Sequence, residues 1–173
     1  MTNPTNAEAQ PSALYRAVWR WHFYAGLLIL PFMILMAITG GVYLFKDELN
    51  DGLYGDLRLV DPAASAPLAP SAIAARALKS YPGTLKAYAP PAAPNRAAEV
   101  KIADGEGLKN TIYVNPYSGE VLGALWDGGA AGSPAMWVVR KLHSLDYVGW
   151  WGNRIIEAVA GWAVLLTVTG VYL

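Results

Sequence analysis

The chain has 173 residues, of which 54% are hydrophobic and only 15% charged, with thirteen basic and thirteen acidic side chains and a formal net charge of zero. Charged residues make up about 25% of an ordinary soluble domain, so this chain is charge-poor, and its scattered, balanced charges argue against a basic nucleic-acid-binding surface. The absence of cysteine excludes disulfides, thiolate metal sites and iron–sulfur clusters.

Residues 1–13 are polar and unpatterned, and we expect a disordered cytoplasmic tail. A first transmembrane helix is predicted over residues 14–46, because His22 to Phe45 is 24 residues without a formal charge and about 20 apolar residues cross a bilayer. The alternative is a cleaved signal peptide. Its apolar region is usually about 7–15 residues and ends at a small-residue cleavage site, whereas this run is longer and ends at Lys46.

Arg16 and Arg20 lie just before this span. Basic residues flank the cytoplasmic end of a membrane helix, so we expect a cytoplasmic N-terminus and residues 47–152 in the periplasm. We predict a linker over residues 47–70. They begin with a polar segment that continues the helix briefly, and they end in a proline- and alanine-rich stretch.

A small α+β module is predicted over residues 71–126. Ser71 has the character of a helix N-cap, Ile73, Ala77 and Leu78 mark the apolar side of a short helix, and Pro82-Gly83 ends it. The period then becomes two-fold. Strands over 99–102 and 111–114 flank a turn at 104–107, and a second turn at 115–120 precedes a further strand that begins at Val121.

Residues 127–152 form a glycine-rich loop followed by an interfacial helix. Pro134 after Ser133 predicts its start, and Tyr147, Trp150 and Trp151 are typical of a membrane interface. Residues 153–173 predict a second transmembrane helix, in which Arg154 and Glu157 are spaced for an i,i+3 pair.

That helix reaches the chain end without a polar flank, which favours truncation. Its last segment, TGVYL at 169–173, also repeats TGGVYL at 39–44 with one glycine fewer. The match favours two helices that pack through a common small-residue face.

Several of these segments resemble the PepSY-associated transmembrane proteins over roughly residues 14–173. The similarity rests on an opening with arginine, tryptophan and His22, on the span ending TGGVYLF, on TIYVNPYSGEVLG at 111–123, and on KLHSLDYVGWWGNRIIEAVAGW near the end. The resemblance implies a membrane α-helical fold with two spans present and a periplasmic PepSY-like module between them. Members of this family commonly have four spans, which also favours truncation.

The family includes bacterial inner-membrane ferric-siderophore reductases that carry b-type haem. The resemblance therefore implies electron transfer in iron uptake, haem b as cofactor, and His22 and His143 as axial ligands of haem iron. Neutral imidazole is a standard ligand of haem iron, and ionisable residues at spans are candidate functional residues. Each histidine also has a plain alternative, a helix-end anchor for His22 and a solvated surface residue for His143.

About 1.5 Å of rise per residue places His22 near the cytoplasmic face and His143 near the periplasmic face, so one haem cannot bind both. Each would need a partner ligand from missing transmembrane helices or from a second copy of the chain, since the sequence has two histidines.

The leading hypothesis is a haem-dependent reductase of a periplasmic ferric siderophore or similar ferric chelate. Its rival is a membrane-anchored PepSY binding or regulatory protein without a cofactor. A third hypothesis is that the chain is a non-functional remnant of a truncated gene.

Overall fold

The computed structural model of this protein describes residues 12–173, and their contacts divide them into two compact units. The first unit holds the described residues up to Ile38 together with Leu142–Leu173, and the second holds Thr39–Lys141. The disordered tail predicted for residues 1–13 lies almost wholly outside the described residues. Its last residue, Ala13, already belongs to a helix whose first turn is capped by the Ser12 hydroxyl, 3.1 Å from the Tyr15 amide.

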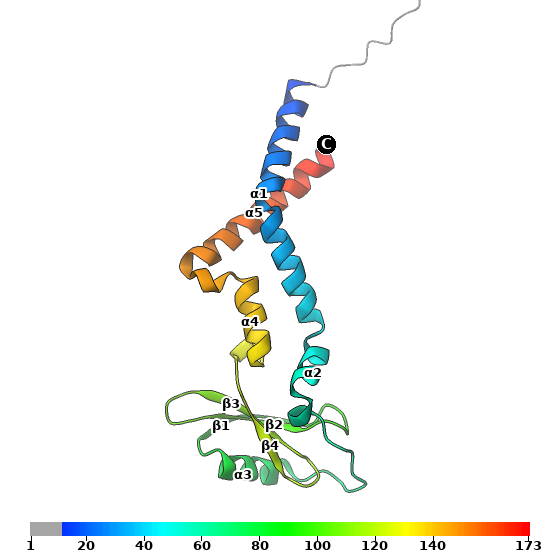
Figure 1. The fold of residues 1–173 in the computed structure, drawn as a ribbon, viewed down its shortest axis with the longest axis vertical. Helices are drawn as coiled ribbons and strands as arrows, with labels where there is room; N and C mark the ends of the chain where they lie inside the picture. The colour runs from blue at the N-terminus through cyan, green and yellow to red at the C-terminus, as the bar shows by residue number, and fades with distance from the viewer. Residues whose placement is uncertain (1–11) are drawn as a thin grey trace, which may run out of the picture. The chain divides into compact units, whose positions relative to one another are not determined.

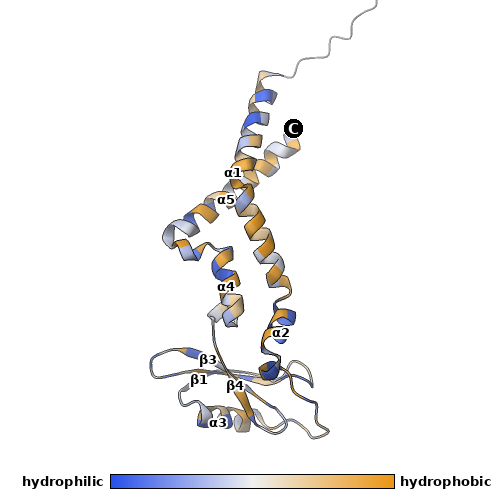
Figure 2. Ribbon diagram, in the orientation of Figure 1, coloured by the Kyte–Doolittle hydropathy of each residue, from blue (hydrophilic) through white to orange (hydrophobic). Residues whose placement is uncertain are grey.

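The first unit is built mainly from helix α1 (Ala13–Leu44) up to Ile38 and from helix α5 (Trp150–Tyr172) (Figure 1). Both are long and apolar enough to cross a membrane, and only 11% and 6% of the residues in their most apolar windows are buried. The core helix of a soluble protein would be mostly buried, so these outward-facing apolar side chains suit a lipid environment instead. Figure 2 shows both helices mostly in the hydrophobic colour, with hydrophilic residues near the beginning of each.

The second unit contains a four-stranded antiparallel sheet in the order β1-β2-β3-β4. Its strands are β1 (Thr84–Ala89), β2 (Ala98–Ala103), β3 (Lys109–Val114) and β4 (Val121–Trp126). The hairpin predicted over 99–114 and the strand at Val121 are therefore confirmed. Strand β1 was not predicted, because as an edge strand it exposes nearly every side chain and shows no two-fold alternation.

Helix α3 (Pro70–Ser80) packs on one face of the sheet and makes the core with it. Ile73 and Ala77, predicted to face inward, are fully buried among Val100, Ile112 and Val114. The prediction of Ser71 as N-cap is wrong. The helix begins one residue earlier at Pro70, with Ala69 in the cap position and no side-chain cap, since proline is well suited to the first turn.

The turn predicted between β3 and β4 is held by Asn115, whose side-chain carbonyl accepts hydrogen bonds from the amides of Tyr117 and Ser118. Gly119 follows with φ +73°, and a Cβ there would collide with the guanidinium of Arg76. Arg76 in turn donates from α3 to the Ser118 carbonyl. Glycine is thus required by both backbone conformation and space, and the turn is tied to the helix beneath the sheet.

In the linker expected over residues 47–70, the helical continuation is longer than predicted, and the proline- and alanine-rich remainder up to residue 69 has no helix or strand. Helix α2 (Lys46–Arg58) follows α1 after a break at Phe45 and contacts β3 and β4, with a local irregularity at Tyr54. Figure 1 shows α2 and α3 on opposite faces of the sheet. Packing against the sheet stabilises a segment with two glycines that would form only a weak helix alone.

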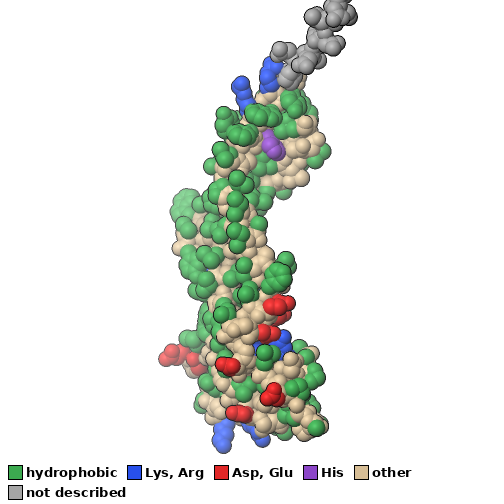
Figure 3. Space-filling view, turned by 45° about the vertical axis from the view of Figure 1, so that its right-hand side comes forward, with side chains coloured by type: hydrophobic (Ala, Val, Ile, Leu, Met, Phe, Trp, Pro, Cys, Tyr) green, Lys and Arg blue, Asp and Glu red, His purple; other side chains and the backbone are tan. Residues whose placement is uncertain are grey.

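The remaining elements are the short 3-10 helix η1 (Gly129–Ala131), helix α4 (Pro134–His143) and the 3-10 helix η2 (Asp146–Val148). The predicted start of α4 is confirmed, and the Ser133 hydroxyl caps it by accepting from the Met136 amide at 3.2 Å. In the space-filling view of Figure 3, hydrophobic side chains cover the long helices, whereas most of the visible acidic side chains lie over the sheet-containing unit.

Candidate functional sites

His22 lies within the first unit, where α1 meets α5. Its Nδ1 is 2.8 Å from the hydroxyl oxygen of Thr169. The next residue, Gly170, leaves room for the ring, since a Cβ there would be 3.3 Å from His22 Cε1. The predicted residue His22 is thus half-buried in a contact between the two helices.

The Thr169 hydroxyl also lies 2.9 Å from the Leu165 carbonyl and 3.2 Å from the Leu166 carbonyl. If it donates its one hydrogen to either carbonyl, its oxygen is left to accept from His22 Nδ1–H. That arrangement would leave the lone pair of the neutral imidazole on Nε2, where it could bind a metal.

An apolar cavity of about 430 Å³ lies between α1 and α5 in the same unit. Its lining includes Gly26, Ile29 and Met33 of α1 and Ala163 and Leu166 of α5. Gly26 is four residues after His22 and so lies on the same side of α1. The imidazole and an apolar cavity are accordingly neighbours on one helix face.

His143, the second predicted ligand, is the last residue of α4 and is half-buried. The structure does not bring it to His22. Helix α5 runs antiparallel to α1, and the 19 residues from Trp150 to Thr169 rise about 28 Å. The two histidines therefore belong to different ends of α5, and residues 12–173 contain no group of three or more histidine, aspartate or glutamate side chains that could hold a metal ion.

The small-residue packing predicted from the TGGVYL and TGVYL repeats is only half present. Gly170 faces His22, but a Cβ on Gly41 would meet nothing within 4 Å. Antiparallel helices put the ends of the two repeats apart, which explains why they do not share one contact. The repeat nevertheless contains Thr169, the partner of His22 that we did not predict.

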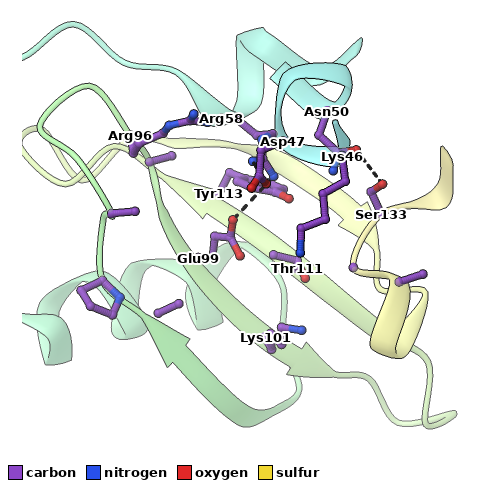
Figure 4. A pocket seen from close by; sticks show the side chains of 16 residues that line it. Lys46, Asp47, Asn50, Arg58, Arg96, Glu99, Lys101, Thr111, Tyr113 and Ser133 are labelled. Carbon is purple, nitrogen blue, oxygen red and sulfur yellow. Dashed lines mark hydrogen bonds and ion pairs between the residues drawn. The ribbon is translucent and has the colours of Figure 1, made fainter. Parts of the chain in front are cut away.

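A second candidate site lies in the sheet-containing unit and was not predicted. A cavity of about 450 Å³ is enclosed by the start of α2, by β2 and β3, by residues 89–97 and by Ala131–Ser133 (Figure 4). Asn50 of α2 and Ser133 close one side, with the buried Ser133 hydroxyl donating to the Asn50 side-chain oxygen at 2.7 Å.

Ion pairs hold the basic groups beside this cavity. Arg58 and Arg96 both donate to Asp51 Oδ1, at 2.9 Å and 2.5 Å. They meet because the chain after α2 pairs with the loop before β2 through an antiparallel bridge between Leu59 and Arg96. On the opposite side Lys101 donates to Asp127 at 3.1 Å.

Burial and pairing shift the acid–base properties of this cluster. Burial alone would raise the pKa of Asp51, but hydrogen bonds from Arg96 and Arg58 outweigh it, so the pKa of Asp51 lies below its usual range. Burial likewise opposes the charge of Arg58, yet its bond to Asp51 leaves the Arg58 pKa raised. Burial and the nearby charge of Glu99 raise the pKa of Tyr113, whose hydroxyl thus keeps its proton at neutral pH.

Two long apolar helices with outward apolar faces and a small antiparallel sheet with helices fit a membrane protein that carries a PepSY-like module. The family described as the PepSY-associated TM region matches residues 19–173. The chain belongs to this family. A search of curated proteins finds no match to this chain.

Proposed function

We propose that this protein is an electron-transfer protein of the bacterial inner membrane that serves iron uptake. It would use b-type haem, with His22 as an axial ligand near the cytoplasmic side and His143 as a ligand near the periplasmic side. The acceptor would be a periplasmic ferric siderophore or similar ferric chelate, and the N-terminus would be cytoplasmic.

The observation that carries the proposal is the hydrogen bond from His22 Nδ1 to Thr169. Metal-ligating histidines almost always donate the second ring N–H to a fixed acceptor, which orients the ring and leaves the other nitrogen for the metal. The apolar cavity beside His22 suits the hydrophobic face of a porphyrin. Haem, when bound, supplies one-electron chemistry, while the chain supplies the ligand and its orientation.

Each haem needs a second axial ligand from elsewhere, because His22 contacts the C-terminal end of α5 whereas His143 precedes its N-terminal end. We propose that further transmembrane segments or a second copy of this chain supply it. The protein would then act as an assembly within the lipid bilayer.

An absorption spectrum of the detergent-purified protein, before and after dithionite, tests the proposal. We expect a Soret band and α/β bands that sharpen on reduction, and a weaker signal in His22→Ala and in His143→Ala. Thr169→Val removes the orienting hydroxyl and should lower haem occupancy about tenfold or more, whereas Thr169→Ser should retain it. Absence of any haem band in the unsubstituted protein would overturn the proposal.

The second candidate function is that of a membrane-anchored binding or regulatory protein without a cofactor. The polar cavity of the sheet-containing unit favours this second function, because a ligand could bind there without haem in the protein. This candidate requires that His22→Ala and His143→Ala leave both the visible spectrum and the function of the protein unchanged.

A further inference from the structure

The face of the sheet opposite α3 is unusually polar for a surface that lies beneath a helix. In the β2–β3 register Glu99 pairs with Tyr113 and Lys101 with Thr111. These side chains share one face because alternate residues of a strand point the same way. Thr111 and Tyr113 are only 2% and 3% exposed. Burying polar groups costs free energy unless they are hydrogen-bonded, so packing of an apolar core does not explain why polar side chains occupy this face.

Basic side chains outnumber acidic ones among the residues that line this cavity, although Asp51 and Asp127 behind the lining bring the whole cluster to equal numbers of each sign. Four basic side chains line it, from Lys46, Arg58, Arg96 and Lys101, but only two acidic ones, from Asp47 and Glu99. Asp51 and Asp127 are not among the lining residues, although they hold three of the basic groups in place. Fixed guanidinium and ammonium groups that face a cavity are suited to bind carboxylates.

Lys46 has no fixed acidic partner of this kind. Among residues 12–173 no ion pair joins it to a carboxylate, and its ammonium lies 5.5 Å from the centre of the Tyr43 ring. In Figure 4 its side chain extends from α2 toward Thr111. Lys46 is therefore the basic group of this cavity that is most available to a ligand.

The basic groups occupy two ends of the cavity. Figure 4 shows Arg58 and Arg96 together at one end and Lys101 at the other, with Lys46 between them. A ligand with more than one carboxylate could bind both ends at once. Ala89, Pro90 and Ala92 provide an apolar wall for a carbon skeleton, and Glu99 and the Thr111 hydroxyl can accept hydrogen bonds from the ligand.

We propose that this cavity binds a small organic acid that carries at least two carboxylates. Its volume of about 450 Å³ lies within the range of ligand pockets, about 300–1,000 Å³. Arg58 and Arg96 bind one carboxylate, Lys46 and Lys101 bind another, and the apolar wall contacts the carbon chain. The inference stands on the cavity alone and does not rest on the haem proposal.

The test is isothermal titration calorimetry of citrate into the detergent-purified full-length protein at pH 7 and low ionic strength. Acetate and inorganic phosphate serve as comparison ligands, because acetate has one carboxylate and phosphate has no carbon skeleton. We expect saturable citrate binding that is at least about tenfold tighter than binding of either comparison ligand, since an added charge-assisted hydrogen bond is worth about that factor or more.

Two charge reversals locate the site. Lys46→Glu should weaken citrate binding at least about tenfold, and the milder Lys46→Gln should weaken it less. Lys79→Glu makes the same charge change on the exposed surface of α3, across the sheet from the cavity, and should leave the affinity within about twofold. Circular dichroism verifies that each variant is folded.

Three results would overturn the inference: no citrate binding by the unsubstituted protein, phosphate binding as tight as citrate binding, or equal weakening by Lys46→Glu and Lys79→Glu. The titration requires no haem. A protein without a Soret band that binds citrate would therefore refute the proposed electron transfer and support ligand binding in the cavity. A protein with a Soret band that does not bind citrate would support electron transfer and refute ligand binding in the cavity.

Discussion

The two units of this protein use apolar side chains in opposite ways. In the helical unit many large apolar residues point outward, and Trp21, Leu28 and Val171 are 72%, 70% and 86% exposed. In the sheet-containing unit Ile73 of α3 and Ile112 of β3 are fully buried where the helix packs on the sheet. Water drives burial in the second unit, whereas a lipid environment, which the family and the exposed apolar helices suggest for the first unit, would remove that driving force there. Similar residues therefore contribute differently to stability in the two units.

The polar groups differ in the same way. In the helical unit the contact between His22 and Thr169 joins residues 147 positions apart in the sequence and links two apolar helices. In the other unit charged groups form a connected cluster, in which Asp51 accepts from two arginines. A polar contact between apolar helices is a candidate for function. A cluster of paired charges beside a sheet can also serve stability.

The largest expected effect comes from removing a core side chain of the sheet-containing unit. Ile112→Ala should destabilise that unit by about 3 kcal/mol, because it leaves a cavity in a packed core. Leu28→Ala, on the exposed surface of α1, should cost less than about 1 kcal/mol. Native-state hydrogen exchange of the detergent-solubilised protein measures both. Equal losses would show that the two units are stabilised in the same way.

The next effect concerns Asp51 and acid. Its pKa is lowered in the folded protein by Arg96 and Arg58, despite the opposing effect of burial. An unfolded chain therefore binds more protons than the folded one between the lowered pKa and the ordinary value of 3.8. The stabilisation is fully present above the ordinary value and is lost as the pH falls through the lowered one.

Asp51→Asn should accordingly destabilise the sheet-containing unit by about 2 kcal/mol at pH 7 and flatten its loss of stability in acid. Hydrogen exchange and chemical denaturation at pH 7 and at pH 3 measure both changes. Asp56→Asn is the matched control, since Asp56 is an exposed residue of the same helix and should change stability by less than about 0.5 kcal/mol. An unchanged acid profile in Asp51→Asn would refute the assignment.

The features that the sequence predicted are those written in a local pattern. Long apolar runs identified both long helices, alternation identified the β2–β3 hairpin, and Ser133-Pro134 identified the start of α4. Strand β1 and helix α2 lacked such a pattern, because an edge strand has no buried side and α2 depends on the sheet for its stability.

Neither candidate site could be completed from the sequence. His22 was predicted as a possible ligand, but its partner Thr169 is brought to it only by the antiparallel packing of α1 and α5. Arg96 lies 45 residues from Asp51 and reaches it through the bridge at Leu59. Long-range contacts of this kind follow from tertiary structure, and no spacing rule contains them.

The smallest expected effect concerns the ion pair that the sequence did predict. Arg154 and Glu157 form an i,i+3 pair at 2.6 Å, and their side chains are 54% and 63% exposed. Exposed pairs contribute little, because solvent screens them and fixing two long side chains costs entropy. Arg154→Gln should therefore change stability by less than about 0.5 kcal/mol, measured by thermal unfolding in detergent at low and high salt.

Arg154 also lies 5.4 Å from the Trp150 ring centre. A loss of stability in Arg154→Gln that does not depend on salt and is absent from Glu157→Gln would therefore be assigned to that contact. A loss as large as that of Asp51→Asn would show that exposure does not separate the ion pairs of the two units.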